Sequence, residues 1–277
     1  MRNRPLFLAT AIAIVCLSGE GLARNYNPTL GAFFDPATGT VDTQAFRTYA
    51  GELGVAMVPK FLGPAATLGS MGFEVSYDLS LTDINRDNYY WKGVPELNVP
   101  AVSEDPSSLL TTSQLRLRKG LPYSLQLGGV ITHLHQSDLW GIGLELGWAL
   151  QEGFRYIPDF AVVSSVNTIL GAGDLAMIEV GSAFLVSKAF SVAGLFSIAP
   201  VFGYHLVYIN AGSHVTNTFV TSGGVTAPTS FVIGQQNIFR HRALVGLNAI
   251  ITVVAIGAEV GIAPGQRTYS FKLGVTF

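Results

Sequence analysis

The sequence predicts an all-β protein that closes into a single antiparallel transmembrane β-barrel of about ten strands, within a range of roughly 8–12. Three observations predict this fold class. Apolar and polar residues alternate over much of the chain, aromatic residues stand near the ends of the alternating segments, and the high apolar content is not gathered into helix-length runs. A soluble β-sandwich is the alternative, but its outward faces would be polar and would not need so many aromatic strand ends.

The composition supports strands rather than helices as the membrane-spanning elements. Hydrophobic residues make up 49% of the 277 residues and charged residues 12%, and the mean hydropathy is +0.40. A transmembrane helix needs roughly 18 or more consecutive apolar residues, and no such run follows the first two dozen positions. Barrel strands fit this composition because only every second residue faces lipid.

The amino terminus predicts export. Residues 1–23 read as a cleavable signal peptide, with Arg2 and Arg4 ahead of an apolar core and a small-x-small site that ends at Ala23. Cleavage there removes Cys16, the single cysteine, so the mature chain is expected to contain no disulfide or cysteine chemistry. Residues 24–51 are expected to be a periplasmic lead-in with a short helix over 42–50, and residues 52–277 the outer-membrane barrel.

Alternation then gives the strands in order. They are expected at 52–61, 73–82, 124–132, 139–150, 156–170, 174–187, 190–208, 238–251, 253–263 and 267–277. The irregular insertion 84–122 interrupts them, and a short helix or strand is expected near Leu109 to Lys119. Residues 209–236, rich in Gly, Thr, Ser and Asn, are expected to form a surface loop.

The clearest strand also predicts an aromatic girdle. Trp140 and Trp148 lie on the same face of 139–150. Eight residues in a strand tilted by roughly 40° place them about 20 Å apart along the membrane normal, close to the ~25 Å apolar band of an outer-membrane barrel. Tyr204, Tyr208 and Tyr269 are the other expected girdle residues.

The last strand carries a family resemblance. Tyr269, Phe271, Leu273, Val275 and Phe277 share one face, and this row with its terminal Phe resembles the C-terminal assembly signal of bacterial outer-membrane β-barrel proteins. The resemblance implies that the barrel-assembly machinery reads this row. It also implies a Gram-negative outer membrane, with lipid and lipopolysaccharide as surrounding partners.

The same resemblance sets an orientation, because Phe277 is then periplasmic. Residues 209–236 fall outside, as a long extracellular loop should. The insertion 84–122 falls in the periplasm, where turns are normally short. Either the insertion is unusual or the strand count is wrong by two.

Isolated charges on the inward rows are the candidate functional residues. The expected lumen-lining charges are Glu74, Asp78, Glu145, Glu179, Arg240, Arg242, Glu259 and Lys272. They either pair across a narrow lumen and fill it, or line a polar conduit that selects solutes.

Other chemistry finds little support in the sequence. His133 and His135 share a strand face near Asp138, but two imidazoles without a third fixed ligand do not define a metal site, and no metal is assigned. No hydrolase, phosphate-loop, zinc-protease or dinucleotide motif is present. We therefore expect no enzyme activity, no cofactor and, without a basic patch, no nucleic-acid partner; the sequence assigns no oligomeric state.

Two functions fit these observations. The first is a narrow channel or transporter for small solutes, carried by the inward charges. The second is a closed barrel with a structural or surface-interaction role. They differ in whether the lumen is continuous.

Overall fold

The computed structural model describes residues 26–35, 37–92, 106–192, 196–222 and 225–277. Ten strands form a barrel wall: β3 (Phe73–Asp83), β4 (Leu109–Leu121), β5 (Leu125–Leu134), β6 (Trp140–Gln151), β7 (Asp159–Leu170), β8 (Leu175–Ser187), β10 (Phe196–Ser213), β13 (Gln236–Ile251), β14 (Val254–Ala263) and β15 (Gln266–Thr276). The smaller elements are η1 (Leu30–Phe33), β1 (Phe34–Asp35), β2 (Thr40–Val41), α2 (Thr43–Met57), α3 (Tyr89–Lys92), β9 (Phe190–Val192), β11 (Thr216–Ser222) and β12 (Val225–Phe231).

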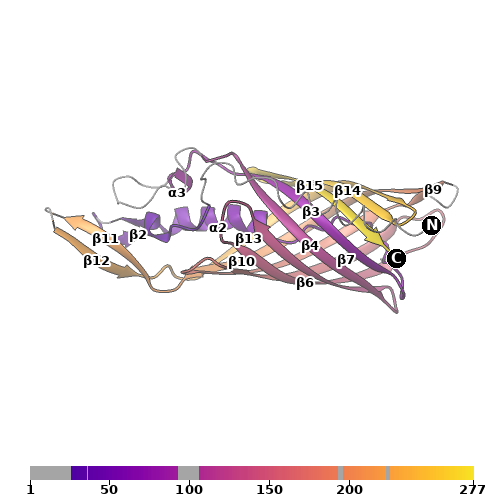
Figure 1. The fold of residues 1–277 in the computed structure, drawn as a ribbon, viewed down its shortest axis with the longest axis horizontal. Helices are drawn as coiled ribbons and strands as arrows, with labels where there is room; N and C mark the ends of the chain where they lie inside the picture. The colour runs from indigo at the N-terminus through magenta and orange to yellow at the C-terminus, as the bar shows by residue number, and fades with distance from the viewer. Residues whose placement is uncertain (1–25, 36, 93–105, 193–195, 223–224) are drawn as a thin grey trace, which may run out of the picture.

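The wall is closed. Each wall strand pairs antiparallel with the next, β10 pairs with β13 across the hairpin β11–β12, and β15 pairs with β3 to complete the circle (Figure 1). Closure matters in a membrane because no water is present in lipid to satisfy a free strand edge. The predicted fold class, a single antiparallel barrel of ten strands, is confirmed. Among the described residues, no helix is both long and apolar enough to cross a membrane.

The register fixes the width of the barrel. Following paired residues around the wall from Ile198 leads back to the same strand at Asn210, a stagger of 210 minus 198, or twelve residues. With a strand spacing of ~4.8 Å and a rise of ~3.3 Å per residue, ten strands with this stagger tilt by about 40°. The backbone radius is then about 10 Å.

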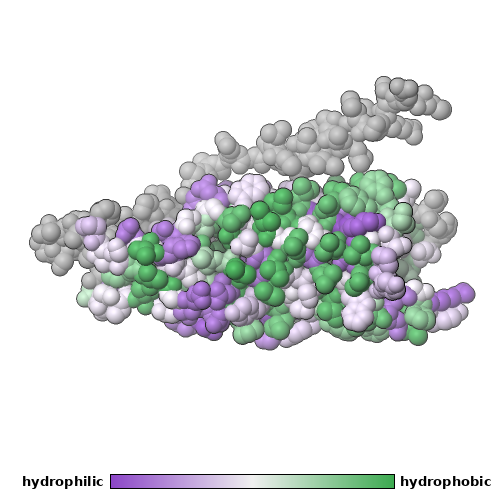
Figure 2. Space-filling view, turned by 90° about the horizontal axis from the view of Figure 1, so that it is seen from below, coloured by the Kyte–Doolittle hydropathy of each residue, from purple (hydrophilic) through white to green (hydrophobic). Residues whose placement is uncertain are grey.

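The two faces of the wall differ in polarity. On β6, the outward residues Trp140, Ile142, Leu144, Leu146 and Trp148 are exposed, and the inward residues between them are buried. Other wall strands repeat this alternation, and Figure 2 shows hydrophobic side chains over much of the wall on the face in view. A continuous apolar outer face is what lipid requires.

The two ends of the barrel also differ. At the turn end, which contains the strand end at Phe277, β4 meets β5 and β13 meets β14 through short turns. At the opposite end, the loop end, residues 84–108 connect β3 to β4, and the hairpin β11–β12 projects beyond the wall (Figure 1). Residues 26–42 also lie at the loop end, where Tyr26 N donates to Gln136 O at 2.9 Å.

The prediction of a strand at residues 52–61 is wrong. The helix expected over 42–50 continues to Met57 as α2, and residues 58–67 then run through the lumen instead of forming part of the wall. Asp42 caps the start of the helix, since its side chain accepts from Ala45 N at 2.9 Å, and Pro59 stands two residues after Met57, the last helical residue. The apolar residues of α2 are buried on nearly all sides because the helix sits inside a barrel.

The tenth strand lies where an irregular insertion was expected. Residues 109–121 form β4, paired with β3 along its length, so the insertion shrinks to 84–108. This strand brings residues 84–108 to the loop end and removes the conflict over long periplasmic turns. It also places residues 26–42 and Phe277 at opposite ends, so one orientation cannot put both in the periplasm.

Residues 209–236, expected to be a surface loop, contain regular strands. β10 continues to Ser213, β13 begins at Gln236, and the hairpin β11–β12 occupies much of the stretch between them. Phe231 at the base of this hairpin stacks on Phe34, with ring centroids 5.1 Å apart. The hairpin is thereby attached to the N-terminal segment at the loop end.

Candidate functional site

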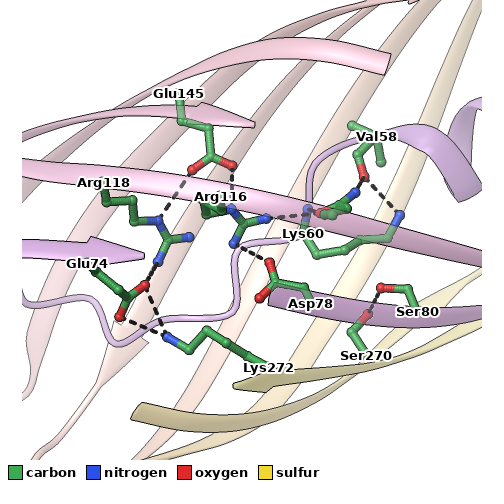
Figure 3. Close-up of polar contacts among 11 residues, drawn as sticks. Val58, Lys60, Glu74, Asp78, Ser80, Arg116, Arg118, Glu145, Ser270 and Lys272 are labelled. Carbon is green, nitrogen blue, oxygen red and sulfur yellow. Dashed lines mark hydrogen bonds and ion pairs between the residues drawn. The ribbon is translucent and has the colours of Figure 1, made fainter. Parts of the chain in front are cut away.

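Six charged side chains form a continuous series of ion pairs on the lumen wall, which we call the charge ladder (Figure 3). In order, they are Asp78, Arg116, Glu145, Arg118, Glu74 and Lys272. Arg116 is central, with Nη1 3.2 Å from Asp78 Oδ2 and Nε 3.3 Å from Glu145 Oε1. Acid and base alternate, so each charge in the ladder has an opposite neighbour.

The second half of the charge ladder reaches across β5. Arg118 Nε lies 3.4 Å from Glu145 Oε2, and Arg118 Nη1 lies 3.5 Å from Glu74 Oε1. Lys272 Nζ, 3.2 Å from Glu74 Oε2, completes the series. Gly128 on β5 permits the crossing, because a Cβ there would lie 3.3 Å from both the Arg118 and Glu145 side chains. Buried charges persist only when they are paired in this way.

Four of the eight predicted lumen charges belong to the charge ladder: Glu74, Asp78, Glu145 and Lys272. Its two arginines were missed because the segment near Leu109 to Lys119 was expected to be a short helix or strand within an insertion, and was not placed in the wall. The signal was present in Gln114-Leu-Arg-Leu-Arg-Lys119, where Arg116 and Arg118 alternate with Leu115 and Leu117. The leucines face outward and the arginines inward.

The other four predicted charges also face the lumen, apart from the charge ladder. Glu179 is buried and accepts from Asn167 Nδ2 at 2.9 Å. Arg242 is buried with Nη1 3.5 Å from His205 Nδ1. Glu259 is buried on β14, and Arg240 is half-buried on β13. The inward placement of all eight residues agrees with the alternation in the sequence.

The chain's own residues 43–67, which we call the plug, run from the loop end into the lumen and fill it; Thr43, Gln44 and Arg47, in the first turns of α2, are exposed at the loop end. Its helix, α2, packs against apolar side chains near the loop end of the wall; these are Leu110, Leu134, Val207, Ile209 and Ile238. The helix contributes Phe46, Leu53 and Met57, all fully buried. The plug therefore shares a hydrophobic core with the wall.

Glycine allows the helix to approach the wall closely. A Cβ on Gly54 would lie 2.5 Å from Ile209 Cδ1 and 3.3 Å from Glu179 Oε1, and one on Gly51 would collide with the Arg240 guanidinium. An α-helix with its side chains is ~10–12 Å across. Inside a wall of about 10 Å radius, it leaves only about 4–5 Å on each side, which is one layer of side chains.

After the last residue of α2, the plug continues toward the turn end as an extended segment held by polar contacts. Lys60 Nζ donates to the carbonyls of Val55, Ala56 and Val58 at 2.7–3.0 Å, so it satisfies the carboxyl end of α2. Lys60 N also donates to Gln114 Oε1 at 3.3 Å. Figure 3 shows Lys60 beside the charge ladder, which is formed by wall residues alone.

Nearer the turn end, the plug is tied to three wall strands or their turns. Ala65 N donates to Ser187 Oγ at 2.8 Å, and Thr67 N donates to Glu152 Oε2 at 2.6 Å. Phe61 packs with inward residues that include Leu185 and Leu244. The plug thus makes contacts from the loop end nearly to the turn end.

One ionisable group of the helix lies at the loop end, outside the wall strands. Glu52 accepts a hydrogen bond from Trp91 Nε1, on α3, at 2.6 Å. Burial raises the pKa of the Glu52 carboxyl, although the Trp91 donor opposes the rise. The contact joins the plug to the connection between β3 and β4.

The predicted girdle residues lie on the outer surface. Trp140 and Trp148 are exposed near opposite ends of β6. Tyr204 is exposed and hydrogen-bonded to His241, Tyr208 donates to Asn237 Oδ1 at 2.7 Å, and Tyr269 is half-buried. Their membrane contacts remain predictions.

The predicted assembly row also faces outward on β15. Phe271, Leu273 and Phe277 are exposed, while Tyr269 and Val275 are half-buried. Phe277 exchanges backbone hydrogen bonds with Phe73 at 2.8 and 3.0 Å. The terminal residue therefore lies where the first wall strand meets the last.

The histidine pair gives no metal centre. The His133 and His135 rings lie 5.5 Å apart, and His133 Nε2 is 3.2 Å from Ser137 O. Asp138 instead accepts from Asn27 Nδ2 at 2.6 Å. Within the part of the chain that the structure describes, no group of three metal-binding side chains comes together.

The tilted closed wall, its apolar outer face and its paired interior charges define a transmembrane β-barrel of the bacterial outer-membrane type. The subfamily is not identified: no protein-family model and no curated protein matches the chain.

Several solved structures resemble the chain distantly. Ail, the attachment invasion locus protein of Yersinia pestis, is 8% identical, with 75% of this chain and 99% of that chain covered and a TM-score of 0.29. The KdgM porin is 10% identical, with 74% and 99% covered and a TM-score of 0.35. The translocator domain of the autotransporter NalP from Neisseria meningitidis is 9% identical, with 89% and 98% covered and a TM-score of 0.31. Likenesses at this level carry no argument about function.

Proposed function

We propose that this protein is an integral outer-membrane barrel whose lumen is closed by its own plug, and that it serves a structural or surface-interaction role through its loop end. The observation that carries the proposal is the occupation of the lumen by residues 43–67. Displacing the plug would expose several fully buried apolar side chains, each worth about 1.5–3 kcal/mol. A plug held in this way stays in place without an external force.

The proposal extends to export, assembly and the surroundings of the barrel. The signal peptide at 1–23 exports the chain, the barrel-assembly machinery reads the row that ends at Phe277, and lipid and lipopolysaccharide surround the wall. The protein is not an enzyme and needs no cofactor. The loop end, where the hairpin β11–β12 and residues 26–42 meet, is the surface offered to a partner.

Gated passage of small solutes is the second candidate function. It is favoured by the charge ladder, whose members all belong to the wall. If the plug were displaced, the ladder would remain as a polar lining. This function requires a trigger that releases α2.

Single-channel recording on the refolded protein in a planar bilayer tests the closed barrel. We expect no steady conductance from protein whose insertion is shown by protease protection of the wall strands. Stable, ion-selective steps from the unmodified protein would overturn the closed-barrel proposal. Changes in those steps in Glu145→Gln would then assign the pathway to the charge ladder.

A further inference from the structure

The course of residues 26–72 through the barrel has a consequence for membrane topology. Asp42, just before α2, accepts from Tyr89 Oη at 3.1 Å, so it lies at the loop end. Gly72, just before β3, accepts from Gly120 N at 3.0 Å at the turn end. Between these two points, the chain crosses the whole barrel inside the lumen.

The reversal at the turn end shows that this crossing is built into the fold. Gly69 adopts φ 73°, which favours glycine, and Gly72 N donates to Gly69 O at 3.1 Å. A Cβ on Gly120 would lie 1.9 Å from Gly69 O, so the turn packs tightly against the end of β4. The chain leaves the lumen here and turns directly into the first wall strand.

Residues 26–42 are fixed at the other end by several independent contacts. Asn27 bonds to Asp138 in the turn between β5 and β6, Phe34 stacks on Phe231, and Tyr26 packs edge-on against Trp91 with ring centroids 6.1 Å apart. These contacts involve three separate connections of the wall. Because the wall is closed, residues 43–72 cannot leave it sideways.

We infer that residues 26–42 are displayed on the cell surface, and that they reach it through the lumen of their own barrel. The loop end faces outward because outer-membrane barrels keep short turns in the periplasm and long connections outside. The lumen is thus the passage for the chain's own N-terminal segment. This inference concerns the route of the chain and does not depend on whether the lumen conducts ions.

Cysteine labelling of intact cells tests the inference. Residues 24–277 contain no cysteine, and Cys16→Ser removes the remaining one, so each reporter is unique. Ala37→Cys reports the exposed turn between β1 and β2, and Ser230→Cys reports the exposed base of the hairpin. Met71→Cys, at a position 88% exposed, reports the turn end.

A membrane-impermeant maleimide is expected to label the cysteines at 37 and 230 on intact cells, and the one at 71 only after the outer membrane is permeabilised. Labelling at 230 but not at 37 would overturn the inference, because residues 26–42 would then lie on the periplasmic side. Labelling at 71 alone, or at none of the three, would overturn it too, since the loop end would not face the medium.

A second readout does not depend on thiol reactivity. A protease site inserted between Thr38 and Gly39 lies in the same exposed turn. Protease added to intact cells should cut there and leave the barrel intact. Resistance in cells, with cleavage after permeabilisation, would contradict surface display. Conductance of the unmodified protein distinguishes this failure from a failure of the proposed function.

Discussion

Shortening one buried side chain of the plug should convert the closed barrel into one that opens intermittently. Leu53 on α2 is fully buried within the core that the helix shares with the wall. Leu53→Ala removes apolar contacts that exist only while the helix is docked. The matched control is Leu144→Ala, the same change at a side chain 66% exposed on the outer face.

The expected rise in the population of the displaced plug follows from the burial of Leu53. A buried Leu→Ala change costs about 2–5 kcal/mol. If the displaced plug regains no equivalent contact, the docked state loses this amount relative to the displaced state. Because each 1.4 kcal/mol is about tenfold in an equilibrium constant, the displaced population rises about 30-fold to several thousand-fold.

Planar-bilayer recording measures this population as open time. We expect brief openings in Leu53→Ala whose frequency exceeds that of the unmodified protein, and none above background in Leu144→Ala. Protease accessibility of residues 49–57, which are buried or half-buried in the docked plug, gives an independent measure of plug displacement. If the plug of Leu53→Ala becomes accessible while the bilayer shows no conductance, then the plug is not what closes the lumen.

Three further predictions concern the charge ladder, the loop end and the terminal residue. Arg116→Met leaves Asp78 and Glu145 without their central partner, so we expect a loss of about 3–5 kcal/mol in unfolding free energy from denaturant titration; a loss no larger than that of Arg155→Met, in an exposed turn, would contradict the pairing. Burial raises the pKa of Glu52, so stability should fall as the pH rises above about 4 through the folded pKa, and Glu52→Gln should remove this fall; identical stability profiles across that range would refute the assignment. Deleting Phe277 should reduce the amount of folded barrel in the outer membrane, measured by heat-modifiable gel mobility, while Phe154→Ala, another exposed aromatic at the turn end, should not; equal assembly of both would argue against the C-terminal signal.

The sequence was most informative where the local pattern and the membrane impose the same choice. In the segments 139–150 and 267–277, every second residue is apolar, and strand geometry places these residues on one face. An outer face in contact with lipid requires such rows. The inward placement of Glu145 and Lys272 follows from the same alternation.

Alternation of apolar residues could not distinguish α2 from a strand. Leu53, Val55 and Met57 alternate as strand residues do, but Phe46, Leu53 and Met57 also follow helical spacing. Asp42 as a helix cap and Pro59 beyond the last turn were the available signals for a helix. Inside a barrel the helix is buried on nearly all sides, so no polar face marks its period.

β4 was difficult to identify from the sequence because its two faces differ little in polarity. Its inward row carries Gln114, Arg116 and Arg118, and its outward row includes Thr111 and Ser113 beside leucines. The contrast between the faces is therefore weaker than in β6. Pairing with β3 and β5 is what makes this segment a strand. Once β4 is included in the wall, each later connection can be assigned to the loop end or the turn end of the barrel.

By itself, the sequence determined the fold class, most of the strands and which charges face inward, because side-chain alternation is a property of each strand alone. The tertiary structure alone decided what fills the lumen and where the N-terminal segment lies. The plug is stable only inside a closed wall, where Leu53 meets inward apolar side chains from strands far away in sequence. Likewise, Arg116 has partners only because β3, β4 and β6 curve around one lumen, and no local pattern encodes that distance.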